Sequence, residues 1–177
     1  MNPLAIENQG PDYLGYNGGS TDYNFANAVF QTSTQMANVN TLPFAASFNA
    51  TNMVPGQNIF VTTHSAADSL PYQAATITLL PQTIDGTVAA LSSNGSFTTY
   101  TISLAPYDLF TNLAVLPGQA TLLTNPDNVV VYVDSNTQML NSNSLSVGGV
   151  FRFSGLVFND NGTLRMDCAQ VNDGVAE

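Results

Sequence analysis

Residues 149–171 read GVFRFSGLVFNDNGTLRMDCAQV, and this stretch decides the fold. Two apolar runs flank a segment of Asn, Asp and Gly, which is typical of two antiparallel strands joined by a tight turn. Successive side chains of a strand point to opposite faces, so alternation assigns each of them to the core or to solvent. The predicted inward set is Phe151, Phe153, Val157, Leu164, Met166 and Cys168, and the outward set is Arg152, Ser154, Arg165 and Asp167.

The outward face of this hairpin therefore carries both arginines of the chain beside Asp167. Ion pairs between exposed side chains are worth about 1 kcal/mol or less each. We interpret the group as a solvated charge cluster rather than an active site.

A second hairpin is predicted over residues 86–104, where Asn94-Gly95 favours a two-residue type I′ turn. That turn places Leu91 opposite Thr98. The core face of the hairpin then carries Ala89, Leu91, Tyr100, Ile102 and Leu104.

From residue 44 onward, segments rich in β-branched and aromatic residues alternate with Gly, Pro and Asn, as in all-β proteins. Residues 105–128 form a long connection, in which Asp108 can cap a short helix. Strands are predicted near residues 44–49, 57–63, 74–80, 84–92, 96–104, 129–134, 149–158 and 163–171.

The chain also contains an internal repeat, in which residues 55–61 match residues 147–153. A hairpin followed by three strands has the strand count of a five-stranded OB-like barrel. We therefore predict an all-β fold of OB-like, Greek-key small barrel units. Residues 84–177 form the complete unit, residues 44–83 a partial unit that lacks its opening hairpin, and residues 1–43 an irregular N-terminal extension.

The extension is predicted to close the partial unit, because an uncovered sheet would expose its edge strands. It can fold back on its own chain, which gives a monomer, or add to a neighbouring copy, which gives a head-to-tail assembly. The extension lacks the strict alternation of a donor strand, which favours the first closure.

The charge balance excludes two classes of partner. Two Lys and Arg residues stand against 12 Asp and Glu residues, for a formal net charge of −10. So few cations cannot neutralise nucleic-acid phosphates or an anionic membrane surface. No apolar run approaches the roughly 18 residues that a membrane-spanning helix needs, so no membrane insertion is predicted.

Charged residues make up only 8% of the chain, and amides and hydroxyls take their place. We interpret this composition as that of an extracytoplasmic protein, either secreted or on the cell surface. Residues 1–4 lack the basic and apolar segments of a signal peptide, so, if the protein is exported, we expect this chain to be a mature fragment or a chain cut for expression.

The apolar and glycine pattern from Val147 to Gly155, with the NDNGTLRM hairpin after it, resembles an uncharacterised family of bacterial extracytoplasmic β-domains. That family is described as a domain of unknown function and occurs as tandem OB-like barrels. The resemblance covers about half of the chain, and more loosely residues 44–88. It implies an OB-like barrel, export and no established activity.

Candidate catalytic residues are few. His64, the only histidine, stands with Ser65 and Asp68, the residue types of a hydrolytic triad. Their spacing within one loop does not set Ser against His with Asp behind, and the chain has no Gly-x-Ser-x-Gly motif. Cys168 falls on an inward strand face, so it is interpreted as a core residue. We predict that the protein is not an enzyme.

Calcium is the one cofactor for which ligands can be named. Asp134 with Asn136, and Asn159 with Asn161, place oxygen atoms at alternate positions of two predicted loops. The EF-hand loop with its distal Glu is absent, and Asp and Asn also favour turns without any metal. These four residues are the candidate calcium ligands.

Tyr72, Tyr107 and Tyr132 are predicted to be exposed and are candidates for sugar stacking, because OB barrels bind oligosaccharides on one face. We expect a non-enzymatic, exported structural or adhesive β-module of a cell-surface protein or assembly. The alternative is a glycan- or peptide-binding module that uses the barrel face and the 105–128 loop.

Overall fold

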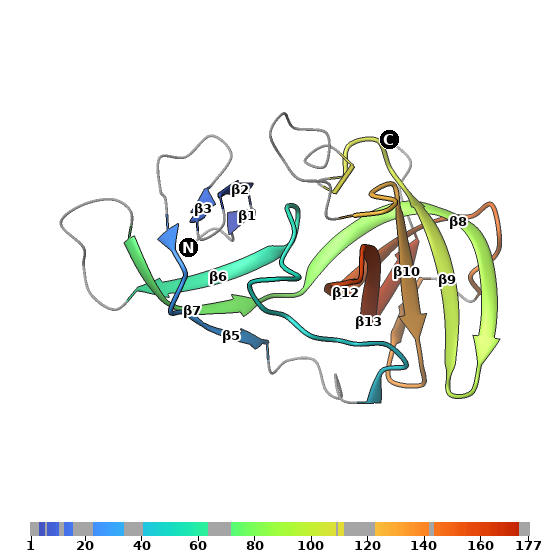
Figure 1. The fold of residues 1–177 in the computed structure, drawn as a ribbon. Coiled ribbons are helices and arrows are strands. Elements are labelled where there is room, and N and C mark those ends of the chain that lie inside the picture. The colour runs from blue at the N-terminus through green and yellow to red at the C-terminus, as the bar shows by residue number, and fades with distance from the viewer. Residues whose placement is uncertain are drawn as a thin grey trace.

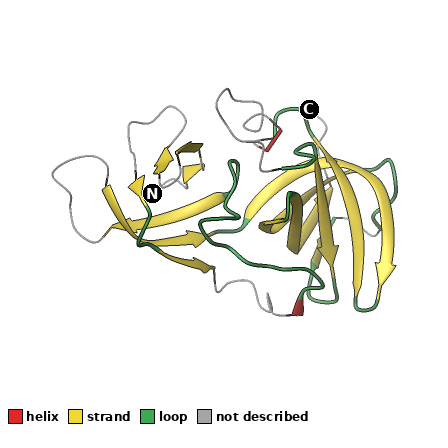
Figure 2. Cartoon of the chain, in the orientation of Figure 1, coloured by secondary structure: helices red, strands yellow, loops and turns green. Residues whose placement is uncertain are grey.

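The computed structural model describes residues 4–5, 7–10, 13–15, 23–33, 41–63, 72–108, 110–111, 123–141 and 144–173. These residues are almost entirely strands and loops, and the helical ones are confined to position 41 and to 110–111 (Figures 1 and 2). The predicted all-β class is confirmed. Across this part of the chain, no helix has the length and apolar character needed to cross a membrane.

Five strands form a closed barrel. They are β8 (Gln82–Asn94), β9 (Phe97–Leu104), β10 (Asn128–Val133), β12 (Val150–Asp160) and β13 (Thr163–Asp173). Their order is β10-β9-β8-β12-β13, and pairing of β10 with β13 closes the ring. The β10–β13 pair is parallel and the other neighbours in the ring are antiparallel, as in an OB-like barrel. A short strand, β11 (Gln138–Leu140), also pairs with β13.

The barrel core is the one that alternation predicted for residues 149–171. All six predicted inward side chains are buried in one cluster. The turn between β12 and β13 is formed by Asn161 at φ 51° and Gly162 at φ 90°. Positive φ at both central residues defines a type I′ turn, which fixes the register of this hairpin.

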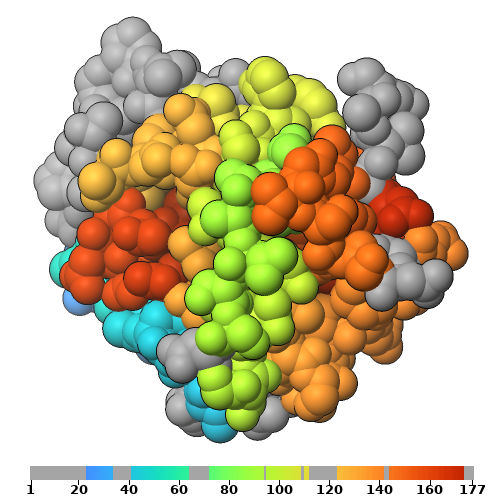
Figure 3. Space-filling model, turned by 90° about the vertical axis from the view of Figure 1, so that its right-hand side faces the viewer, coloured from blue at the N-terminus to red at the C-terminus, as the bar shows by residue number. Residues whose placement is uncertain are grey.

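The β8–β9 hairpin differs from the prediction in two ways. Its turn is Gly95-Ser96, with Gly95 at φ 62°, so Leu91 pairs with Tyr100 and not with Thr98. A β-bulge between Val88 and Ala90 then sets Val88 on the core face in place of Ala89. Leu91 lies beyond the end of the core and is 52% exposed, on the strand that crosses the surface in green in Figure 3.

A second sheet lies beside the barrel (Figure 1). Its centre is β7 (Tyr72–Leu79), which is antiparallel to β6 (Asn58–Thr63) and parallel to β5 (Val29–Thr32). The remaining strands of this sheet are β1 (Leu4–Ala5), β2 (Glu7–Gly10), β3 (Tyr13–Gly15) and β4 (Tyr23–Asn24). Because β1 pairs with β6, and β4 with β7, the N-terminal extension folds back on its own chain.

Residues 44–49 do not form the strand that was predicted for them. In the second sheet, β5 stands where that strand was predicted. It pairs in parallel with β7, as β10 pairs in parallel with β13 in the barrel. Residues 42–48 are instead an irregular segment, here called the strap, whose backbone bonds from Ala46 N to Phe44 O and from Ser47 N to Ala45 O are local. The strap crosses to the barrel and packs against it.

Candidate functional site

The candidate calcium ligands are separated by the fold. Val129 pairs with Leu164, which pairs in turn with Asn159, so Asn159 and Asn161 lie near the start of β10. Asp134 follows the end of β10. The structure therefore does not bring the four residues into one site, and in the described ranges no group of three or more His, Cys, Asp or Glu residues is placed to hold a metal ion.

Both loops use these side chains to stabilise turns. Asp134 Oδ1 accepts hydrogen bonds from the backbone N–H groups of Asn136 at 2.8 Å and Thr137 at 3.2 Å, and its Oδ2 accepts from Asn136 Nδ2 at 3.0 Å. The buried Asn159 Oδ1 accepts from Gly162 N at 2.7 Å. These are the local roles that Asp and Asn have in turns.

The three candidate tyrosines lie in different surroundings. Tyr72 begins β7 and has its ring 5.9 Å from that of Tyr23. Tyr107 follows β9 and is 59% exposed. Tyr132 is only 7% exposed, so the prediction that it faces solvent is wrong. The reason is the strap, whose Phe44 ring lies 4.8 Å from the ring of Tyr132.

The candidate triad of His64, Ser65 and Asp68 lies outside the described residues. Cys168 is buried, as its inward position predicts, and burial raises the pKa of its thiol to about 12. A thiol with so high a pKa is a poor nucleophile at neutral pH. Asp108 accepts a hydrogen bond from Phe110 N at 3.0 Å, as its predicted capping role requires, and of the predicted short helix only residues 110–111 are among the described residues.

The predicted charge cluster is divided between two ion pairs. Arg152 Nε lies 2.8 Å from Asp85 Oδ1, and the Arg152 side chain is 46% exposed. Arg165 Nε lies 2.7 Å from Asp160 Oδ2, in a more buried position. Asp167 belongs to neither pair. Only the first pair is a solvated surface pair of the kind that was predicted.

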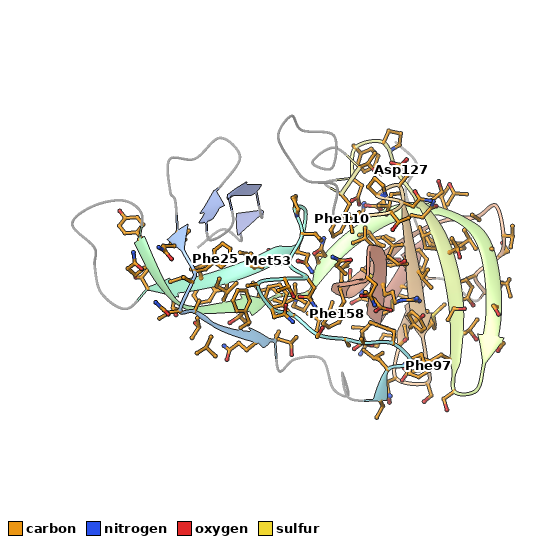
Figure 4. The ribbon with its side chains drawn as sticks, in the orientation of Figure 1. Phe25, Met53, Phe97, Phe110, Asp127 and Phe158 are labelled. Atoms are coloured by element: carbon orange, nitrogen blue, oxygen red, sulfur yellow. The ribbon has the colours of Figure 1, made fainter. Side chains whose placement is uncertain are left out.

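The outer face of β10, β13 and β12 is covered by the strap and the second sheet, and we call this contact the seam. One row across it is Tyr132, Asp167 and Leu156, and the next row ends in Arg165 and Phe158. Leu156 and Phe158 are fully buried and belong to the core of the second sheet, with Phe25 and Met53 (Figure 4). One strand, β12, thus contributes to two cores.

Arg165 is a polar residue of the seam that contacts both the strap and the barrel. Its guanidinium carbon lies 5.7 Å from the centre of the Phe44 ring and 5.9 Å from that of Tyr132. Nη1 donates a hydrogen bond to the Tyr132 hydroxyl. Cation–π contacts of this kind strengthen when water is excluded, so Arg165 joins the strap to the barrel.

Gln57 makes a second polar connection across the seam. Its side chain is 1% exposed, and its Nε2 donates to the backbone oxygen of Val157 at 2.9 Å. Its Oε1 accepts from Val54 N at 2.9 Å. Both hydrogen bonds are buried, so losing either would leave an unpaired backbone group.

Asp167 is the exception in the seam. Its Oδ2 is buried and has no hydrogen-bond partner. Burial, and then the charge of Asp134, raises the pKa of this carboxyl to about 6. Burial likewise raises the pKa of Asp108 to about 6, against the opposing effect of its hydrogen bond from Phe110.

Sequence reasoning missed the seam because it treated β12 as buried on one face only. The signal was present in Leu156-Val157-Phe158, where three apolar residues follow one another without alternation. A continuous apolar run is typical of a strand that is buried on both faces.

The outer face of the second sheet is a further surface of note. Thr62 pairs across the sheet with Thr76, and their hydroxyls are hydrogen-bonded; Gln31 Nε2 donates to Thr78 Oγ1 at 2.8 Å. Phe60, on the same face, is 38% exposed. Strands β5, β6 and β7 contain no charged residue.

Comparison of the chain with known protein families and with curated proteins finds no match in either. The described residues thus present an OB-like barrel, a seam that joins it to a second sheet, and one uncharged sheet face.

Proposed function

We propose that the chain is a non-enzymatic, exported structural or adhesive β-module of a cell-surface protein or assembly. The observation that carries this proposal is the seam. The outer barrel face over β10, β13 and β12 holds the chain's own strap, with the Phe44 ring 4.8 Å from that of Tyr132. A face used in this way joins two sheets into one body, which suits a part whose role is mechanical.

The polar groups of the described residues support the same proposal. Asp85 and Asp160 are ion-paired to arginines, and Asp134 and Asp108 hold turns. Acid–base and nucleophilic catalysis instead need side chains that converge on a space for substrate. Export is supported by the composition, and by the resemblance of the Val147–Gly155 pattern and the NDNGTLRM hairpin to tandem bacterial β-domains.

The adhesive part of the proposal rests on the uncharged face of β5, β6 and β7. Two pairs of its hydroxyl and amide groups are hydrogen-bonded to each other, Thr62 with Thr76 and Gln31 with Thr78. Groups already paired within a surface lose little when water leaves it, so this face has a low desolvation cost. A neutral face also lets a chain of net charge −10 approach other acidic surfaces.

Two assays test the proposal. A turnover screen over esters, glycosides and peptides is expected to stay at the blank level, and turnover that His64→Ala abolishes would overturn the non-enzymatic reading. In the second assay, beads coated with the protein are expected to adhere to cell-envelope preparations. Phe60→Arg should weaken adhesion and Leu91→Arg, a matched change at an exposed apolar residue of the barrel, should not. Equal effects of the two variants contradict the assignment of the face.

The alternative function, a glycan- or peptide-binding module, is favoured by one observation. Tyr107 is 59% exposed at the start of the 105–128 loop, where its ring is open to stacking. A thermal-shift screen with glycans, peptides and calcium distinguishes the two proposals. A ligand at a hundredfold its Kd adds about 2.7 kcal/mol of stability, and a shift lost in Tyr107→Ala would support the alternative.

A further inference from the structure

We propose that the seam is a pH-sensitive lock, in which protonated Asp167 holds the strap against the barrel and ionised Asp167 loosens it. This goes beyond a structural or adhesive role, because it makes the contact between the two sheets respond to acidity. It rests on the position of one carboxyl group and on what surrounds it.

The position of Asp167 is set by the barrel. Asp167 pairs with Tyr132 on β10 and with Leu156 on β12, so its side chain lies in a row between two buried residues of the seam. Its Oδ2 is buried without a hydrogen-bond partner. A buried, unpaired carboxylate oxygen carries a large desolvation cost when it is ionised and a much smaller one when it is neutral.

The charges that face Asp167 do not offset that cost. On β13, Arg165 is already paired with Asp160 at 2.7 Å and with the Tyr132 hydroxyl. After β10, Asp134 is an acid and repels a second negative charge. The apolar residues Leu156 and Phe158 supply no charge from β12, and the strap sequence LPFAASF contains no titratable residue.

These surroundings raise the pKa of Asp167 to about 6, first through burial and second through Asp134. The carboxyl is therefore mostly protonated at mildly acidic pH and mostly ionised at neutral pH. At neutral pH, the seam must either keep a buried charge or open to admit water.

The strap is the element that gives way. Strand β13 is hydrogen-bonded to β10 on one side and to β12 on the other, so it cannot move without breaking the barrel. Among the described residues, the backbone hydrogen bonds of the strap are local: Ala46 N donates to Phe44 O, Ser47 N donates to Ala45 O, and Asn52 Nδ2 donates to Ser47 O. Phe44 of the strap packs on Tyr132, the β10 partner of Asp167, so opening the strap admits water to the row that holds the carboxylate and leaves the barrel closed.

Hydrogen exchange of the peptide that contains residues 42–48 tests the lock, with rates corrected for the intrinsic effect of pH. In the wild-type protein, protection of the strap is expected to fall about tenfold from pH 5 to pH 7.5, the equilibrium change that corresponds to one pKa unit. In Asp167→Asn, which mimics the neutral acid, protection at pH 7.5 should equal that at pH 5. Strap protection that does not change with pH in the wild type, or that still falls tenfold in Asp167→Asn, overturns the proposal.

Two further variants separate Asp167 from other groups. Asp108→Asn removes the other carboxyl whose pKa is raised, and it should leave the pH response of the strap intact. Asp134→Asn removes the repelling charge, so it should move the midpoint of the response to lower pH even if Asp167→Asn does not fold. A response lost in Asp108→Asn, or a midpoint unmoved in Asp134→Asn, would contradict the assignment to Asp167.

Discussion

Truncating Phe158 to alanine measures how much the seam stabilises the protein. The Phe158 side chain is fully buried and its ring lies 5.9 Å from that of Phe44, although the residue belongs to a barrel strand. Loss of a buried phenylalanine costs about 3–5 kcal/mol, through lost transfer energy and the cavity that remains. For a chain of this size, 1 kcal/mol lowers Tm by about 2–4 °C, so we expect Tm to fall by roughly 10 °C.

Phe60→Ala is the matched control, because Phe60 is also a strand phenylalanine but is 38% exposed on the outer face of the second sheet. Its truncation should cost about 1 kcal/mol or less. Urea unfolding followed by circular dichroism gives the free energy of unfolding of both variants. If the two variants lose equal stability, Phe158 is not packed in the core of the second sheet and the seam is wrong.

The free energy of unfolding should fall as pH rises from about 4 to about 6, because folding raises the pKa values of Asp108 and Asp167 to about 6 and the folded state then binds more protons than the unfolded one. A urea midpoint that rises over this range contradicts both shifts. Gly155→Ala should cost about 3 kcal/mol, because a methyl group there would collide with the Asp167 carbonyl oxygen, whereas Gly95→Ala meets no atom and should cost about 1 kcal/mol for its φ of 62°. Equal melting temperatures for the two alanine variants would show that β12 and β13 are not this close. Gln57→Leu should cost about 2–4 kcal/mol in chemical denaturation, since it leaves two buried backbone groups unpaired. A neutral result would mean that water reaches these groups.

Alternation predicted the β12–β13 hairpin correctly because its turn leaves only one register. Asn161 and Gly162 both adopt positive φ, which suits a two-residue turn at that position alone. The β8–β9 hairpin was predicted less well, since Gly95 can take either central position of such a turn. The bulge beside Val88 then restores the apolar face, and no local sequence rule predicts it.

The strap shows what an alternating pattern of apolar residues can and cannot predict. Phe44, Ala46 and Phe48 all pack in or against the second core, as the alternation of residues 44–49 implies. Alternation reports which face of an extended segment is buried, but it does not identify a hydrogen-bond partner. The structure forms β5 in place of the strand that was predicted at residues 44–49. The local sequence of β5 has only a weak strand pattern, and pairing with β7 outweighs it.

For the candidate sites too, local sequence predicts the role of a single residue but not which distant residues meet. Asp134 lies in a turn as predicted, because Asp accepts hydrogen bonds from nearby backbone N–H groups. Asn159 lies at the end of β12 and not in the loop predicted for it, although its side chain accepts a hydrogen bond from the turn residue Gly162. Whether distant turns meet depends on the register of β10 and β13, which local sequence does not contain. The burial of Tyr132 likewise depends on Phe44, a residue 88 positions earlier in the chain.

A double-mutant cycle between Phe44 and Tyr132 tests most directly whether the strap closes the barrel face. Their ring centres are 4.8 Å apart, and a contact of this kind contributes about 0.5–1.5 kcal/mol beyond the area that it buries. The cycle compares the unfolding free energies of the wild type, Phe44→Ala, Tyr132→Ala and the double variant. We expect a coupling energy of at least about 0.5 kcal/mol. Additive effects, with a coupling energy near zero, would show that the strap does not lie on the barrel and would contradict the account.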